Sequence, residues 1–407
     1  MKKQRPLTCI DLFAGCGGLS LGLEKAGFRP LLFSELNKSA SETYIANRPN
    51  HPIVAVADVY TLTNSDLAGL KQRWKEDGYK DIDLVCGGPP CQGYSGIGHR
   101  RTFKVQKHEV PSNHLYKEMI RVIKQVRPRM FLFENVRGLL SGRWTSDGRK
   151  GEIWRDVRQA FGSIDGYDSG HALIQAKDYG VPQKRPRVLI VGIRSDLGWR
   201  LHPESLPAGG LLPAPTGGAP DLYSLLSDLV DPRYKDKLAT TEYLKDSQTA
   251  VQELLRRTSD GRMLRKGDPL SEQEYSQHAP RIVEKFAYMI ANNGEIPEPM
   301  RTKKFAQRVL PKRWGKEGPN ITACALADDF VHFSQPRSLT VREWARIQTF
   351  PDWYVFKGPR TTGGRRRAGD PSKGNWDREV PKYTQIGNAV PVKLAYEIGL
   401  HLADLLQ

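Results

Sequence analysis

Short apolar runs alternate with amphipathic stretches through the first 190 residues of the chain. The pattern predicts buried strands at 8–13, 29–34, 51–57, 83–87 and 130–133, followed by a strand pair at 171–176 and 188–192. Helical periodicity lies between them at 19–26, 39–47 and 115–126. Strands that alternate with helices are typical of a doubly wound, mostly parallel sheet, so we expect an α/β fold.

The pattern changes beyond the last of these strands. Residues 206–220 are rich in proline and glycine, and the next hundred residues are polar with weak periodicity, which indicates a second domain or a long insertion. Regular structure returns at 340–350, where Thr340 and Glu343 have the spacing of a helix capping box. The chain closes with an amphipathic helix at 392–406.

The composition indicates a large globular protein. Its 407 residues are 39% hydrophobic and 26% charged, which excludes disordered and fibrous classes and suggests about two or three domains. No apolar run approaches about 18 residues, the length that crosses a membrane. The N-terminus lacks the apolar core of a signal peptide. We therefore expect a soluble, intracellular protein.

Charge narrows the class of partner. The formal net charge of +17 favours a polyanion, nucleic acid first, although a generic basic enzyme would show the same balance. The five cysteines are too sparse for a disulfide framework. No two of them have the C-x-x-C spacing that indicates zinc, so we expect no metal.

A glycine cluster, residues 15–18, directly follows the first predicted strand and opens a helix. Glycine lets the backbone approach a ligand closely, and a helix N-terminus offers free N–H groups, as in nucleotide-binding turns. Glu35, which lies 20 residues after Gly15, suits a ribose hydroxyl pair, and Asp58 suits an adenine amino group. The G-x-G-x-x-G spacing of a dinucleotide site is absent, so a tight turn without a ligand is the alternative.

Two further segments reach the same edge of the predicted sheet. Residues 87–95, GGPPCQGYS, follow the fourth strand, and their prolines stiffen a turn that presents Cys91. Glu134 follows the strand at 130–133, so its carboxylate emerges at the same edge. We interpret Cys91 as a reactive thiol and Glu134 as an acid beside it. A structural cysteine and a solvated acid are the alternatives.

The segment QKRPR, residues 183–187, places Gln183, Arg185 and Arg187 at alternate positions. In an extended segment these side chains share one face. Arginines there could orient a base or a phosphate, and a solvated basic loop is the alternative.

Eight segments in this order resemble the DNA (cytosine-5)-methyltransferase family along nearly the whole chain. They are DLFAGCGGLSLG (11–22), Glu35, Asp58, GGPPCQGYS (87–95), ENV (134–136), QKRPR (183–187), RSLTVREWARIQTFPD (337–352) and QIGNAVP (385–391). The resemblance implies a Rossmann-like methyltransferase sheet with a smaller target recognition domain. We expect the catalytic domain at 1–196, the recognition domain at 197–320, and a segment at 321–407 that returns to the first domain.

The resemblance also implies S-adenosylmethionine as the cofactor. The cofactor-binding residues that it implies are Phe13, Gly15, Gly17, Gly18, Leu19, Glu35, Asp58, Val59, Pro90, Leu115 and Asn388. The catalytic residues that it implies are Cys91, Glu134, Arg185, Arg187 and Gln183. Cys91 would add to carbon 6 of a flipped-out cytosine, and Glu134 would neutralise charge at ring nitrogen 3. Arg187 or Arg185 would hold the base's carbonyl oxygen, while a basic loop at 92–111 closes on the base.

The function that the resemblance implies is sequence-specific methylation of double-stranded DNA in a bacterial restriction–modification system. We expect a monomer in the cytoplasm, with a cognate restriction endonuclease as a candidate partner. A tRNA cytosine-5 methyltransferase with the same catalytic core is the alternative enzyme. A binding module that has lost activity is the non-enzymatic alternative.

One segment departs from the family pattern. Residues 355–382 contain eight Lys or Arg and three acids, and the segment is longer and more basic than the family's join usually looks. A flexible surface loop is one interpretation. The other is an added contact to DNA phosphates, which would position the protein without reading bases.

Overall fold

The structure is a computed structural model that describes residues 5–90, 111–145, 147–199, 206–301, 307–313, 319–320, 329–361 and 379–407. Cys91, the predicted nucleophile, lies outside these ranges, as does Cys324. Residues 92–110 of the predicted loop and most of the basic segment 355–382, which we call the basic insertion, also lie outside them. In the described part of the chain, no helix is both long and apolar enough to cross a membrane.

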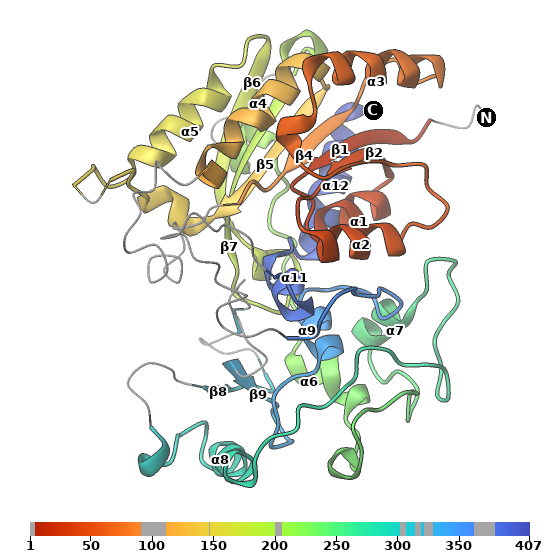
Figure 1. Ribbon diagram of the computed structural model, residues 1–407, viewed down its shortest axis with the longest axis vertical. Helices are drawn as coiled ribbons and strands as arrows, with labels where there is room; N and C mark the ends of the chain where they lie inside the picture. The colour runs from red at the N-terminus through yellow and green to blue at the C-terminus, as the bar shows by residue number, and fades with distance from the viewer. Residues whose placement is uncertain are drawn as a thin grey trace.

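Seven strands form one sheet within the described residues, in the order β3-β2-β1-β4-β5-β7-β6 (Figure 1). They are β1 (Leu7–Leu12), β2 (Phe28–Ser34), β3 (Val54–Val56), β4 (Leu84–Gly87), β5 (Met130–Val136), β6 (Tyr167–Gln175) and β7 (Pro186–Arg194). The strands from β3 to β5 pair in parallel, whereas β7 runs antiparallel to both of its neighbours. This confirms the predicted doubly wound α/β fold.

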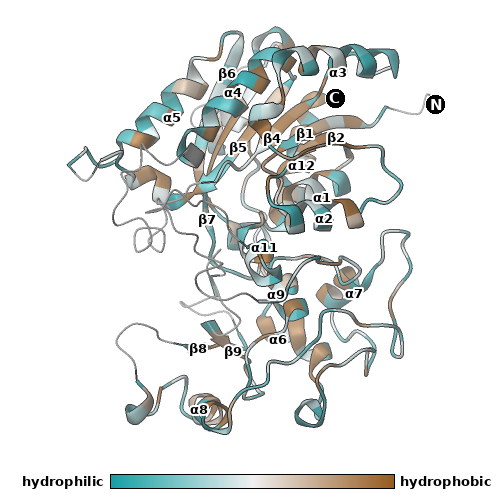
Figure 2. Cartoon of the chain, in the orientation of Figure 1, coloured by the Kyte–Doolittle hydropathy of each residue, from teal (hydrophilic) through white to brown (hydrophobic). Residues whose placement is uncertain are grey.

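Helices cover both faces of the sheet because alternate strand residues point to opposite sides. Ile10 and Leu12 join the apolar cluster under α3 (Asn64–Glu76), α4 (Leu115–Val126) and α5 (Glu152–Gly162). Cys9 joins the cluster on the other face, with α1 (Gly18–Lys25) and α12 (Val392–Leu406). α2 (Lys38–Ala46) lies beside α1. In Figure 2 the strands are largely hydrophobic and the outward faces of α3 and α5 largely hydrophilic.

The last helix packs on the first one through small residues. A Cβ added at Gly22 of α1 would lie 2.4 Å from the Cβ of Ala395 in α12, and one added at Gly399 would lie 2.8 Å from that of Ala26. Only glycine fits at such an approach. The C-terminal end of the chain therefore lies against the helix that follows the glycine turn.

A second lobe lies below the sheet in Figure 1. Its elements are α6 (Leu222–Leu226), α7 (Ala250–Arg256), α8 (Pro280–Ala291), α9 (Val341–Ile347) and α11 (Lys382–Asn388), with the paired strands β8 (Arg308–Val309) and β9 (Phe330–Val331). Along the whole described chain, short 3-10 helices span Val59–Thr61, Pro111–His114, Arg137–Ser141, Ala176–Tyr179, Ser195–Leu197, Pro207–Gly210, Ser227–Leu229, Tyr234–Asp236 and Glu298–Met300.

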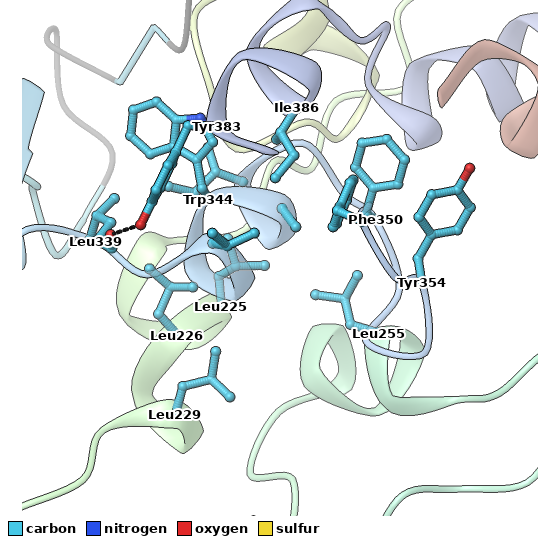
Figure 3. Close-up of a cluster of buried hydrophobic side chains, with 14 of the residues drawn as sticks. Leu225, Leu226, Leu229, Leu255, Leu339, Trp344, Phe350, Tyr354, Tyr383 and Ile386 are labelled. Atoms are coloured by element: carbon cyan, nitrogen blue, oxygen red, sulfur yellow. Dashed lines mark hydrogen bonds between the residues drawn. The ribbon is translucent and has the colours of Figure 1, made fainter. Parts of the chain in front are cut away.

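The core of this lobe joins residues from distant parts of the chain (Figure 3). Leu225 and Leu255 pack in one apolar cluster with Trp344 and Phe350. The region 197–320 therefore shares its core with the residues that follow it. The domain bounds given above stay a prediction.

α9 is buried along its whole length. The predicted capping box closes its first turn: the Thr340 hydroxyl accepts from the Glu343 N–H at 3.1 Å, and the Glu343 carboxylate accepts from the Thr340 N–H at 2.9 Å. The helix is shorter than the predicted 340–350, because Thr349 adopts a left-handed φ of 61°. Charged side chains on a helix buried on all sides need partners inside the protein.

Among the charged side chains of α9, Arg346 has the largest set of buried carboxylate partners. Its Nη1 donates to Asp228 Oδ1 at 2.6 Å, and its Nη2 donates to Asp352 Oδ2 at 2.6 Å. Arg256 of α7 donates to the other Asp228 oxygen at 2.6 Å, and the Tyr243 hydroxyl donates to Asp352 at 2.7 Å. All four charged side chains are fully buried. We call this set, Asp228, Tyr243, Arg256, Arg346 and Asp352, the Asp228 network.

Asp228→Asn should strongly destabilise the protein. The substitution removes the carboxylate shared by Arg256 and Arg346, and breaking a buried ion pair costs about 3–5 kcal/mol. The free energy of unfolding, measured by urea denaturation, should fall by that amount. The control is Asp196→Asn at the exposed pair with Arg194, which should change it by less than about 1 kcal/mol. Equal losses in the two variants would contradict the role of the network.

Candidate active site

Several of the predicted site residues lie where the order of the parallel strands reverses. β2 and β3 lie on one side of β1, while β4 and β5 lie on the other. The glycine turn leaves the carboxyl end of β1, and Gly88–Pro90 leaves the carboxyl end of the adjacent β4. Open α/β sheets bind their ligands at such a switch point.

The glycines of the turn have different tasks. A Cβ at Gly17 would lie 2.9 Å from both the Tyr354 hydroxyl and the Tyr44 ring, and one at Gly18 would lie 2.4 Å from the Val390 carbonyl oxygen. A Cβ at Gly15 would meet nothing within 4 Å. Packing alone therefore requires glycine at the second and third positions, and the open space that a ligand could fill lies at Gly15.

Glu35, which directly follows β2, forms a hydrogen bond with the glycine turn. Its two carboxylate oxygens accept from the Gly15 N–H at 2.9 Å and from the Asn37 N–H at 2.7 Å. Burial raises the pKa of Glu35, and these two backbone donors oppose the shift. The carboxylate keeps further acceptor positions, because two oxygens together offer about four.

The other predicted cofactor residues lie in varied surroundings. Asp58 follows β3, and its carboxylate accepts from the Tyr60 N–H at 3.0 Å. Val59 and Leu19 are buried, Phe13 and Leu115 are partly buried, and Pro90 and Asn388 are exposed. Four neighbouring parallel strands are each followed, at one edge of the sheet, by one of the predicted residues: Phe13, Glu35, Asp58 and Pro90.

Glu134 and Arg187 form an ion pair across the antiparallel strands β5 and β7. Arg187 Nε lies 2.5 Å from Glu134 Oε1, and both side chains are about nine-tenths buried. The other carboxylate oxygen of Glu134 lies against Gly88, where a Cβ would come within 2.7 Å of it. The acid therefore lies on the turn that leads to residue 91.

Asn135 holds the same turn, although sequence reasoning assigned it no role. Its side-chain amide donates to the Pro89 carbonyl at 3.2 Å. Its place next to Glu134 in the ENV segment was the only available signal, because the contact joins residues 46 positions apart.

Gln183 and Arg185 lie deeper than Arg187. Arg185 Nη2 donates to the carbonyls of Gly387 and Ala389 at 2.8 and 3.0 Å. Gln183 Nε2 donates to Gln348 Oε1 at 2.7 Å and to the Ile347 carbonyl at 3.1 Å. These contacts hold the segments of α9 and α11 together, whereas Arg187 forms the ion pair with Glu134. A catalytic part for the other two stays a prediction.

Comparison with known proteins identifies the family. A family model described as C-5 cytosine-specific DNA methylase matches residues 7–403. The chain belongs to this family. It is accordingly a DNA cytosine-5 methyltransferase, and its reaction requires a methyl donor.

Individual relatives cover nearly the whole methyltransferase. The Type II methyltransferase M.DdeI of Desulfomicrobium norvegicum is 30% identical over 97% of this chain and 88% of its own. M.Eco47II of Escherichia coli is 31% identical over 98% and 79%. Two solved structures show the same fold. A DNA modification methyltransferase encoded within a prophage (E. coli) has a TM-score of 0.68 and 24% identity, over 98% of this chain and 99% of its own. The Dnmt2 methyltransferase of S. pombe has a TM-score of 0.57 and 16% identity, over 98% of this chain and 99% of its own.

One buried acid beneath the glycine turn titrates in an unusual range. Asp11 of β1 is fully buried and accepts from the Ser20 hydroxyl at 2.6 Å. Burial raises the pKa of Asp11 to about 7, although the Ser20 hydrogen bond opposes the shift. The folded methyltransferase therefore holds a proton at Asp11 that the unfolded chain releases near pH 4.

Asp11→Asn should change how stability depends on pH. Because the folded state binds the extra proton between about pH 4 and 7, the stability that Asp11 contributes falls as pH rises through this window. The melting temperature of the wild type minus that of Asp11→Asn should fall between pH 4 and 7 and level off above pH 8. A difference that stays constant from pH 4 to 7 would show that Asp11 titrates normally.

Proposed function

We propose that the enzyme transfers the methyl group of S-adenosylmethionine to carbon 5 of a flipped-out cytosine at a specific sequence in duplex DNA. The observation that carries this proposal is the Glu134–Arg187 pair, which lies on the Gly88–Pro90 turn beside the glycine turn. An acid and a guanidinium thus lie against the turn that precedes residue 91 in the sequence, next to a nucleotide-type turn.

The residues at the sheet edge fit S-adenosylmethionine. Gly15 leaves space beside the turn, Glu35 keeps acceptor positions for ribose hydroxyls, and Asp58 lies after the next strand for an adenine amino group. When bound, this cofactor supplies an electrophilic methyl group. The domain assignment that goes with the proposal places the recognition domain at 197–320 across the DNA from this edge.

Cys91 is the proposed nucleophile. The described cysteines, Cys9, Cys16 and Cys86, are all buried, and burial raises the pKa of each thiol, so they are poor sources of thiolate. Cys91 directly follows the exposed Pro90. Addition of its thiolate to carbon 6 raises the electron density at carbon 5, which then accepts the methyl group.

Glu134 and Arg187 serve the base in this scheme. Glu134 shares a proton with ring nitrogen 3 and so neutralises the charge that accumulates during attack. Arg187 holds the carboxylate in place and donates toward the base's carbonyl oxygen. Loss of the carbon 5 proton then expels Cys91. A stacked base cannot be reached in this way, so the cytosine must leave the duplex at a cost of a few kcal/mol.

The relatives support a proposal for the setting of the reaction. Their Type II designation favours a restriction–modification system with a cognate endonuclease in a bacterial cytoplasm. We propose that the enzyme acts there as a monomer. Comparison of methyl transfer to duplex DNA and to tRNA tests the substrate. Transfer to tRNA alone would favour the alternative tRNA cytosine-5 methyltransferase.

A duplex with 5-fluorocytosine at the target position should trap the enzyme. Fluorine cannot leave carbon 5 as a cation, so one methyl transfer should leave the DNA covalently attached to Cys91. The adduct should survive denaturing electrophoresis, require S-adenosylmethionine and map by peptide mass to Cys91.

Two variants control this experiment. Cys91→Ser should give no adduct and no methylation, because a hydroxyl has too high a pKa to add to carbon 6. Glu134→Gln should slow adduct formation. An adduct at Cys86 or Cys324 would refute the assignment of Cys91, and methylation of ordinary DNA without any adduct would refute covalent catalysis.

The basic insertion is proposed to contact DNA phosphates. Replacing Arg365, Arg366 and Arg367 by Gln should weaken binding equally on all sequences, and each lost contact should reduce the log–log salt slope by about 0.9. The control removes three exposed charges, Arg73, Lys75 and Lys80, from the α3 region on the outer face of the sheet. An unchanged slope in the first variant, or the same change in both, would return the insertion to a solvated surface loop.

A further inference from the structure

Tyr354 connects the second lobe with the glycine turn. It lies at the edge of the apolar cluster in Figure 3, where its ring packs against Phe350 and its hydroxyl points away from the leucines. The side chain is fully buried. Its hydroxyl donates to the carbonyl oxygen of Cys16 at 2.6 Å, across 338 positions of the sequence.

This contact helps to hold the plane of a peptide bond in the turn. The Cys16–Gly17 unit is planar, so the direction of the Cys16 carbonyl also fixes that of the Gly17 N–H. The Gly17 N–H donates to the Ala14 carbonyl at 2.9 Å and closes the turn around Gly15. The Tyr354 hydroxyl therefore supports the backbone on both sides of the open position.

A buried ion pair keeps the hydroxyl in place. Arg48 Nη1 lies 3.4 Å from the Tyr354 hydroxyl, and the same guanidinium donates to both carboxylate oxygens of Glu24 at 2.8 and 2.6 Å. Burial raises the pKa of Tyr354 above its ordinary value, so the phenol stays protonated and acts as a donor.

The residues after Tyr354 are fastened to the first lobe as well. The side chain of Asn47 pairs with both backbone groups of Val355, donating to its carbonyl at 2.8 Å and accepting from its N–H at 3.0 Å. The Lys357 N–H donates to the Thr43 hydroxyl at 2.8 Å. The segment is thus held against α2 independently of the tyrosine hydroxyl, and removal of that hydroxyl should leave the lobes together.

We propose that Tyr354 is a positioning residue through which the second lobe holds the glycine turn in its cofactor-binding conformation. The inference rests on the proposed function, since it takes S-adenosylmethionine as the ligand of the turn. Without the hydroxyl, the Cys16–Gly17 peptide gains freedom to rotate. A ligand must then restrict that freedom on binding, which weakens its affinity.

Tyr354→Phe keeps the ring and removes only this donor. The dissociation constant of S-adenosylmethionine for the full chain, measured by isothermal titration calorimetry without DNA, should rise about fivefold to tenfold, the effect of one lost buried hydrogen bond. The KM for the cofactor should rise by the same factor. The kcat at saturating cofactor should stay within about twofold, because Tyr354 touches neither Glu134 nor Arg187.

Tyr243→Phe is the matched control. Tyr243 is also buried in the same lobe and also loses one hydrogen bond, to Asp352, but within the described residues its hydroxyl and ring contact Asp352 and Arg256 rather than the turn. Both variants should lose thermal stability, and only Tyr354→Phe should lose cofactor affinity. Unchanged affinity in Tyr354→Phe, or equal losses in both variants, would overturn the inference. A wild-type protein that binds no S-adenosylmethionine would instead overturn the proposed cofactor, and the inference with it.

Discussion

The carboxylate of Asp228 is buried between Arg256 and Arg346, and Arg346 also reaches Asp352. An unpaired charge at such a depth costs several kcal/mol, so the segments that carry these residues must assemble together. Asp228 lies in the predicted recognition region, residues 197–320, while Arg346 and Asp352 follow that region. Their pairing therefore joins the predicted recognition region to the segment that returns to the sheet. Whatever that returning segment contributes to the site depends on this pairing.

Polar contacts, together with the short segment 183–187, connect α9 with the Glu134–Arg187 pair. Gln348, just after the helix, donates to the Ile386 carbonyl at 2.7 Å and accepts from Gln183. Arg185 then holds the carbonyls of the α11 segment, and two residues further on Arg187 pairs with Glu134. Because each buried donor needs its acceptor, a displacement of α9 would leave several of these groups unsatisfied. The second lobe and the Glu134–Arg187 pair are thus positioned by connected contacts.

Local periodicity was sufficient to predict the strands and the edge at which they end. Glu134 was expected at that edge, whereas Arg187 was expected only on one face of an extended segment, and the two side chains lie 2.5 Å apart. The burial of Gln183 and Arg185 could not be predicted in this way. Their acceptors lie 164 to 204 positions away along the chain, and contacts at such separation leave no periodic signal. The burial of α9 could not be predicted either, since Arg and Glu on a helix usually indicate a solvated face.

The glycine turn shows why a motif and its structural cause must be separated. Gly15 has open space beside it, as a ligand-binding turn requires, but Gly17 is glycine because Tyr354, Tyr44 and Arg48 fill the space where a side chain would lie. Gly18 is glycine because the chain near Val390 passes over it. Residues more than 330 positions later therefore define the shape of a turn that looks local in the sequence. The glycines of this turn are required by the packing of the C-terminal segment on α1 as well as by a ligand. The turn therefore acquires its final geometry only when that segment is in place.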